Sequence, residues 1–79
     1  MELSIDQALR RGFEAHKLGS LNEAERLYKF ILEADPNHPE ANHNFGILTL
    51  KRGQSDHALH FFLKAVKGNP TITQYWLSY

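Results

Sequence analysis

The feature that most constrains this chain is an internal repeat with a period of 34 residues. When the sequence is aligned with itself at this offset, small or helix-breaking residues coincide, and apolar residues match between them. The identical pairs are Gly12 with Gly46, Gly19 with Gly53, Ala24 with Ala58, and Pro36 with Pro70. The apolar matches are Leu27 with Phe61, Tyr28 with Phe62, and Leu32 with Val66. A period of this length predicts stacked units, each burying its apolar face against the next.

Each unit is predicted to form two helices. In the first helix of the chain, Ser4 and Gln7 have the spacing of a capping box, and the helical pattern stops at Gly19. In the second, Ser20 and Glu23 repeat the capping-box spacing. The apolar stripe of this second helix consists of Leu21, Ala24, Leu27, Tyr28, Ile31 and Leu32.

Prolines and glycines set the remaining boundaries. The second helix is expected to end at Asp35, because proline disfavours helical backbone in the residue before it. A third helix is expected over about residues 39–52, with Pro39 in its first turn, and a fourth over about residues 55–67. The pattern begins again at residue 71 and stops with the sequence, so we expect this chain to be a piece of a longer protein.

Two glycines lie inside predicted helices, where glycine costs roughly 1 kcal/mol relative to alanine. We expect Gly12 to face Ala24, and Gly46 to face Ala58, at points where a side chain would hold the paired helices apart. The alternative is that each glycine marks a helix kink.

Composition excludes several classes of protein. The absence of cysteine excludes a disulfide framework, a thiol nucleophile and thiolate metal sites. Nine Lys plus Arg balance nine Asp plus Glu, so no basic excess indicates binding to nucleic acid or to an anionic membrane. No apolar run approaches the roughly 18 residues of a membrane span, and the N-terminus lacks a signal-peptide core. We therefore expect a cytoplasmic location, with neither a nucleic-acid nor a membrane partner.

The repeat resembles the tetratricopeptide repeat. The residues that carry the resemblance are Gly12, Ala24 and Pro36, which recur as Gly46, Ala58 and Pro70, together with the large side chains of Tyr28, Phe62 and Trp76. The resemblance implies an all-α fold, a right-handed solenoid of antiparallel helix pairs. Residues 4–36 would be the first repeat, 39–70 the second, and 71–79 the truncated first helix of a third. It also implies a concave groove, lined by the first helices, that binds a peptide or a partner protein.

On the pattern of this family, the groove has an apolar centre and a rim of mixed charge, as in a recognition surface. The partner-binding residues implied are Leu9, Phe13, Lys17, Glu40, His43, Asn44, Ile47, Leu50 and Lys51, with Asp6, Arg10 and His16 also facing the groove. The alternative is that Leu9 and Phe13 serve ordinary helix packing, or are covered by another part of the parent protein.

Two subclasses of the family can be compared at single positions. A clamp for the C-terminal carboxylates of chaperones needs cationic and amide side chains. At the corresponding positions this sequence has Leu9, Phe13, Asn44, Gln74 and Ser78, of which only Asn44 fits. The same Asn44 matches the asparagine that holds extended peptide backbone in O-GlcNAc-transferase-like proteins, although Arg10 stands at the equivalent place in the first repeat.

The stretch around Asn44 is similar to repeats that precede bacterial glycosyltransferases and sulfotransferases. An alternative function is therefore the N-terminal, acceptor-recognising part of a larger transferase. A third alternative is a module for self-assembly only.

Neither a metal nor a catalytic site is predicted. His57 and His60 lie three residues apart beside Asp56, a spacing that could chelate, but the repeat places them on an outer helix as a solvated pair. The serines near helix starts suit backbone capping. No phosphate-binding glycine motif and no nucleophile elbow occur. We predict no cofactor, no metal and no enzymatic activity.

The last five residues are rich in large apolar side chains. These are Tyr75, Trp76, Leu77 and Tyr79. Because such a cluster seldom stays exposed to water, we expect the chain to self-associate as a homo-oligomer through this end. The alternative is a monomer with a frayed tail.

Overall fold

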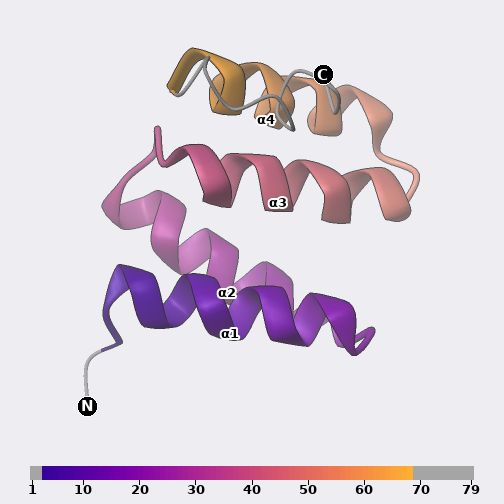
Figure 1. Ribbon diagram of the computed structural model, residues 1–79. Helices are drawn as coiled ribbons and strands as arrows, with labels where there is room; N and C mark the ends of the chain where they lie inside the picture. Colours follow the sequence, from indigo (N-terminus) through magenta and orange to yellow (C-terminus); the bar gives the residue numbers. More distant parts are fainter. Residues whose placement is uncertain (1–2, 69–79) are drawn as a thin grey trace.

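The computed structural model describes residues 3–68, which form four helices and no strand. They are α1 (Ile5–Lys17), α2 (Leu21–Ala34), α3 (Pro39–Lys51) and α4 (Ser55–Gly68), joined by short turns (Figure 1). The all-helical class predicted from the sequence is confirmed, while the predicted third unit at residues 71–79 lies outside the described range. Among residues 3–68, no helix combines the length and apolar character needed to cross a membrane.

The period of the sequence is also the period of the secondary structure. Both bounds of α3 lie 34 residues after those of α1, and both bounds of α4 lie 34 residues after those of α2. Gly19 and Gly53 follow α1 and α3 and have positive φ values of 82° and 78°. A residue with a Cβ rarely adopts this backbone conformation, so each hairpin turn requires glycine. The repeat is therefore structural, and its unit is a helical hairpin.

The two hairpins share one packed structure. Helix α1 packs on α2 and helix α3 packs on α4, while α3 also contacts both helices of the first hairpin. Figure 1 shows α3 lying between α1 and α4. Helix α3 consequently has neighbours on two sides.

One of the two predicted capping boxes is present. The Gln7 amide donates to Ser4 Oγ at 3.1 Å, and the Ser4 amide donates to Gln7 Oε1 at 3.0 Å. The second box is absent, because the Ser20 side chain makes no capping hydrogen bond to α2. Ser20 belongs to the tight turn after Gly19, and its ψ of 68° departs from the extended backbone of a capping residue.

The turn between the hairpins is held by a buried amide that the sequence analysis did not single out. Asn42 Nδ2 donates to the carbonyl oxygens of Pro36 at 3.1 Å and of His38 at 2.9 Å. His38 in turn accepts the Ala41 amide through Nδ1 at 3.1 Å, at the start of α3. Pro39 occupies the first turn of α3, as predicted. Asn42 of α3 thus satisfies two carbonyls of the preceding turn, and His38 of that turn caps the start of α3.

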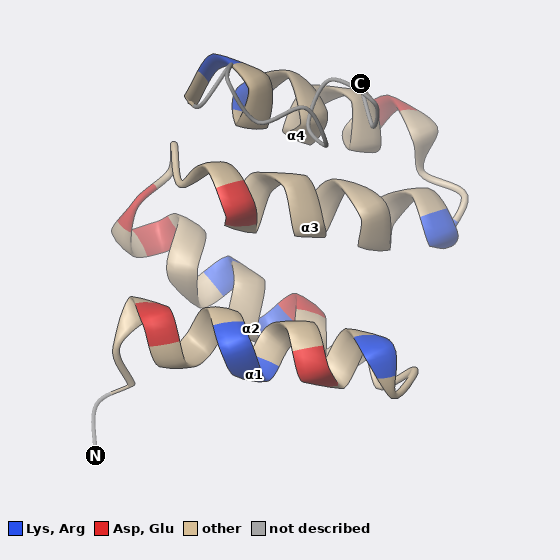
Figure 2. Ribbon diagram, viewed as in Figure 1, with Lys and Arg blue, Asp and Glu red and all other residues tan. Residues whose placement is uncertain are grey.

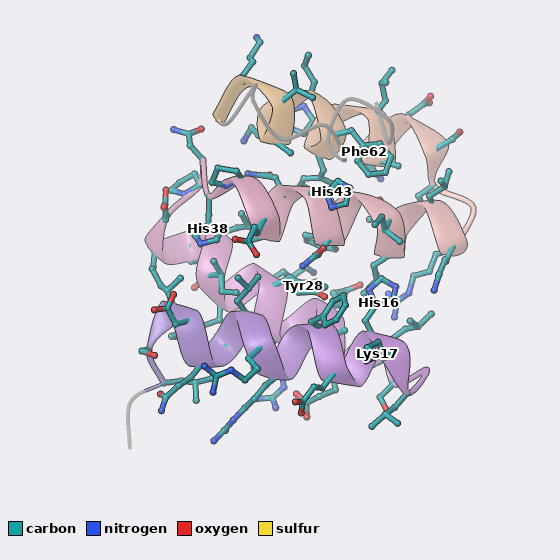
Figure 3. The ribbon with its side chains drawn as sticks, in the orientation of Figure 1. His16, Lys17, Tyr28, His38, His43 and Phe62 are labelled. Carbon is teal, nitrogen blue, oxygen red and sulfur yellow. The ribbon has the colours of Figure 1, made fainter. Side chains whose placement is uncertain are left out.

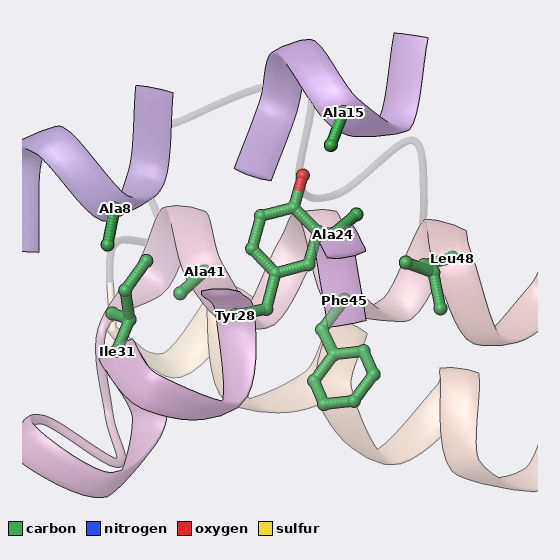
Figure 4. Close-up of a cluster of buried hydrophobic side chains, with 8 residues drawn as sticks. All are labelled: Ala8, Ala15, Ala24, Tyr28, Ile31, Ala41, Phe45 and Leu48. Atoms are coloured by element: carbon green, nitrogen blue, oxygen red, sulfur yellow. The ribbon is translucent and has the colours of Figure 1, made fainter. Parts of the chain in front are cut away.

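The core is built mainly from alanines and a few large side chains (Figure 4). Its buried members are Ala8, Ala15, Ala24, Tyr28, Ile31, Ala41, Phe45 and Leu48. Small residues let the helix backbones approach closely, and Tyr28 occupies the space between α1 and α3. The predicted apolar stripe of α2 is confirmed, because its members are either fully buried or packed against this core.

The helical glycines meet aromatic rings. A Cβ added to Gly12 would lie 2.7 Å from Tyr28 Cε1, and one added to Gly46 would lie 2.5 Å from Phe62 Cε1. The close approach predicted at both glycines is confirmed, but the nearest atoms belong to these rings rather than to Ala24 and Ala58. In each hairpin the aromatic ring, and not the alanine, is the group that lies over the glycine.

Candidate functional site

The candidate site is the exposed surface of α1 and α3, the first helices of the two hairpins. These helices contact each other, so their side chains form one continuous surface. We call this surface the α1–α3 face. Its members are Leu9, Phe13 and Lys17 from α1, and Glu40, Asn44, Ile47, Leu50 and Lys51 from α3. The α1 members follow each other at intervals of four residues, which places them on one side of the helix.

The apolar members of the face differ in exposure. Phe13 is 49% exposed and Leu50 is 52% exposed. Leu9 and Ile47 are half-buried, and Leu9 packs against the core. Leu9 therefore contributes to helix packing, as the alternative interpretation held, whereas much of the Phe13 ring remains in contact with solvent. The face thus has two half-buried apolar side chains, Leu9 and Ile47, and two exposed ones, Phe13 and Leu50.

His43, which the family pattern assigns to the groove, is only 2% exposed. Its ring centroid lies 5.9 Å from that of Phe62 on α4, and burial lowers the pKa of the imidazole. A hydrogen bond with Asn44 and the charge of Glu40 act on the pKa in the opposite direction. His43 is packed between α3 and α4, and we exclude it from the α1–α3 face for that reason.

Two lysines lie next to the exposed apolar side chains. Lys17 Nζ is 5.5 Å from the centroid of the Phe13 ring, in the range of a cation–π interaction. Lys51 follows Leu50 at the end of α3. Within residues 3–68, the ion pairs of the structure involve Arg26, Lys29 and Arg52, and neither of these two lysines. Both ammonium groups are thus available to an anionic partner.

Charge is separated along the face (Figure 2). Asp6 and Glu40 lie in the first turns of α1 and α3, and Lys17 and Lys51 lie in the last turns. This placement suits the helix dipoles, which favour acids at the N-terminus and bases at the C-terminus. The two helices run in the same direction, so these acids lie at one end and these lysines at the other, with the charges of Arg10, Arg11 and Glu14 between them on α1.

A buried polar pair lies beneath the lysine end of the face. His16 is packed edge-on against the Tyr28 ring, with centroids 6.4 Å apart, and lies between α1 and α3 beside Lys17 (Figure 3). Burial, followed by the nearby charge of Lys51, lowers the pKa of His16. Burial also raises the pKa of Tyr28 to about 12. Within the described part of the chain, His16 Nε2 and the Tyr28 hydroxyl have no hydrogen-bond partner. His16 is therefore buried against Tyr28 and does not line the α1–α3 face.

The remaining histidines with ligand spacing are surface residues. His57 and His60 are both exposed on α4. No group of three or more His, Asp or Glu side chains that could hold a metal ion occurs within residues 3–68.

Arg52 makes a connection between the hairpins that the sequence pattern did not indicate. Arg52 donates to the Glu25 carboxylate and, at 2.7 Å, to Asn22 Oδ1, so it ties the end of α3 to α2. No signal in the sequence pointed to it, because the position equivalent to Arg52 in the first repeat is Leu18, which has no polar group. The residues predicted to mediate self-association, Tyr75, Trp76, Leu77 and Tyr79, lie outside the described residues.

No protein-family model and no curated protein matches the sequence of this chain.

Proposed function

We propose that this chain is a protein-interaction module of the tetratricopeptide type, which binds a peptide or a partner protein on the α1–α3 face and catalyses no reaction. The family part of the proposal rests on the residues of the repeat and on their spatial roles. Tyr28 covers Gly12 in one hairpin and Phe62 covers Gly46 in the next, at the same 34-residue offset. Two copies of one hairpin unit are the arrangement from which the right-handed solenoid of that family is built.

The observation that carries the binding function is the exposure of Phe13 and Leu50 on neighbouring helices. Covering a half-exposed apolar side chain of this size contributes about 1 kcal/mol of binding free energy. Aromatic side chains such as Phe13 are also enriched at the centres of binding surfaces.

The face is held by the fold itself. Leu9 packs on the core, and Ile47 is half-buried on α3. A partner would therefore meet a surface that is largely preformed, and ordering of the module would cost little binding free energy.

The test is selection of binders from a random peptide library, followed by titration of the selected peptides in fluorescence anisotropy. Phe13→Ala and Leu50→Ala together should weaken binding about tenfold or more, since two apolar contacts are truncated. Phe30→Ala is the matched control, because Phe30 is a similarly exposed aromatic on α2. Circular dichroism should report unchanged helix content for each variant.

Two outcomes would overturn the proposal. One is that no peptide is enriched. The other is that the selected peptides bind the Phe13→Ala, Leu50→Ala protein as tightly as the Phe30→Ala protein.

A further inference from the structure

The two ends of the α1–α3 face are chemically different, and the accessible apolar surface belongs to one of them. Phe13 is one helical turn from Lys17, and Leu50 is adjacent to Lys51. Asp6 and Glu40 lie at the opposite end of the two helices. A large side chain that docks on Phe13 and Leu50 is therefore placed next to two positive charges.

These two charges differ from Arg26, Lys29 and Arg52, each of which is paired with a carboxylate. Lys29 Nζ lies 3.3 Å from Glu25 Oε2, Arg26 pairs with Glu23, and Arg52 pairs with Glu25. Lys17 and Lys51 have no such carboxylate among residues 3–68. A partner that supplies carboxylates at this end of the face would complement both charges.

We infer that the partner is an acidic peptide segment whose large apolar side chains pack on Phe13 and Leu50 while Asp or Glu side chains beside them pair with Lys17 and Lys51. This inference rests on the proposed function, and it adds the chemistry of the ligand. The ammonium group of Lys17 lies 5.5 Å from the centroid of the Phe13 ring, so a carboxylate that reaches Lys17 is placed beside that ring.

The acids at the other end of the face favour one orientation of the bound peptide. Asp6 and Glu40 offset the charge of Arg10, which lies one turn after Asp6, so the acids of the peptide should cluster at the segment that covers Lys17 and Lys51. Such placement of like and unlike charges sets the register of a bound peptide more than its affinity.

The experiment is parallel selection of an internal, random peptide library on three full-length proteins: wild type, Lys17→Glu with Lys51→Glu, and Lys64→Glu with Lys67→Glu. The last variant is the matched control, because it makes the same change in net charge on α4. Wild type and control should enrich sequences in which Leu or aromatic residues adjoin Asp or Glu. The Lys17, Lys51 variant should bind those peptides at least about tenfold more weakly and should enrich basic sequences instead.

The selected peptides are then synthesised with a free C-terminal carboxylate and as amides. Equal affinity of the two forms is expected, because the carboxylates come from side chains. Loss of binding by the amide form would overturn the inference, because it would show that the lysines bind the C-terminal carboxylate of the peptide. Enrichment of basic or uncharged sequences by wild type, or equal binding to both charge-reversed proteins, would also overturn it.

These outcomes separate the inference from the proposed function. Uncharged peptides that lose affinity on Phe13→Ala, Leu50→Ala would overturn the acidic ligand and leave the binding face intact. Peptides whose affinity is unchanged by this double substitution would overturn both the acidic ligand and the binding face.

Discussion

The Tyr28 ring lies against the α-carbon of Gly12 so closely that a methyl group there would meet Cε1 at 2.7 Å. Tyr28 is fully buried, and its ring is surrounded by core residues (Figure 4). The same relationship joins Phe62 to Gly46 in the second hairpin. Each hairpin is thus closed by an aromatic side chain from its second helix over a glycine in its first.

The substitution Gly12→Ala should lower the free energy of unfolding by up to about 2 kcal/mol. Alanine is favoured over glycine in a helix by about 1 kcal/mol, but overpacking against a fixed ring costs about 1–3 kcal/mol. Urea denaturation monitored by circular dichroism measures the difference. The cost should shrink when Tyr28→Leu is already present, because the smaller side chain leaves room for the methyl group. A Gly12→Ala protein more stable than wild type would contradict the packing relationship.

Gly19→Ala and Gly53→Ala should also lower the free energy of unfolding, but through the backbone and not through overpacking. No atom lies within 4 Å of a Cβ added at either position, so the cost comes from the positive φ alone. We expect a loss of about 1 kcal/mol for each alanine variant. Asparagine tolerates this backbone better than alanine, so Gly19→Asn is expected to be the milder change in the same urea experiment. Equal losses for alanine and asparagine would contradict a backbone origin.

Removal of the Tyr28 hydroxyl should cost little. This oxygen is buried and has no hydrogen-bond partner in residues 3–68. Tyr28→Phe should therefore change the free energy of unfolding by less than about 1 kcal/mol, or raise it, since an unpaired polar group is lost. A larger loss of stability would show that the hydroxyl is hydrogen-bonded in solution.

The same substitution changes the response to alkali. The folded pKa of Tyr28 is raised to about 12, above the ordinary value of 10.0, so the unfolded chain ionises first. Stability is full below about pH 10 and falls as the pH rises from about 10 to 12. Urea midpoints measured across this range should fall less for Tyr28→Phe than for wild type. Parallel curves would contradict the burial of the phenol.

Stability should also fall in mild acid. The folded pKa values of His16 and His43 lie below the ordinary value of 6.5, mainly because both imidazoles are buried. The unfolded chain therefore takes up protons first, and stability is lost as the pH falls below about 6.5 towards the folded pKa values. Urea midpoints at about pH 8 and about pH 5 should differ less for His16→Gln than for wild type. His57→Gln, a change at an exposed histidine, should keep the wild-type difference, and an equal reduction in both variants would contradict this account.

Arg52 should matter more to stability than an exposed ion pair. Its guanidinium and the Glu25 carboxylate are both mostly buried, and they join α3 to α2. Arg52→Ala is expected to lower the free energy of unfolding by about 1–2 kcal/mol. The control Arg26→Ala removes a pair with Glu23 that lies within α2 and is exposed, and it should cost less than about 0.5 kcal/mol. Equal costs in thermal or urea denaturation would contradict a linking role for Arg52.

The helices and their ends could be predicted because the repeat presents every boundary twice. Gly19, Gly53 and Pro39 act through their own backbone geometry, which needs no knowledge of the tertiary structure. The capping box at Ser20 was wrong because the preceding turn sets the backbone of that serine. Its side chain therefore lacks the position that the spacing alone suggested.

The side of α3 that meets solvent could not be predicted in the same way. Helix α3 packs against the first hairpin and against α4, so it buries residues on two sides. Hydrophobic periodicity identifies a single buried stripe and loses its contrast in such a helix. This is the reason that His43 is packed against Phe62 while Leu50, an apolar residue, is exposed.

The central claim is that partners bind on the α1–α3 face, and amide chemical-shift mapping tests it most directly. A peptide selected on the wild-type protein would be titrated into the ¹⁵N-labelled chain. The largest shifts should occur at Phe13, Lys17, Leu50 and Lys51. Shifts centred instead on the exposed residues Phe30 of α2 and Leu59 of α4 would contradict the claim.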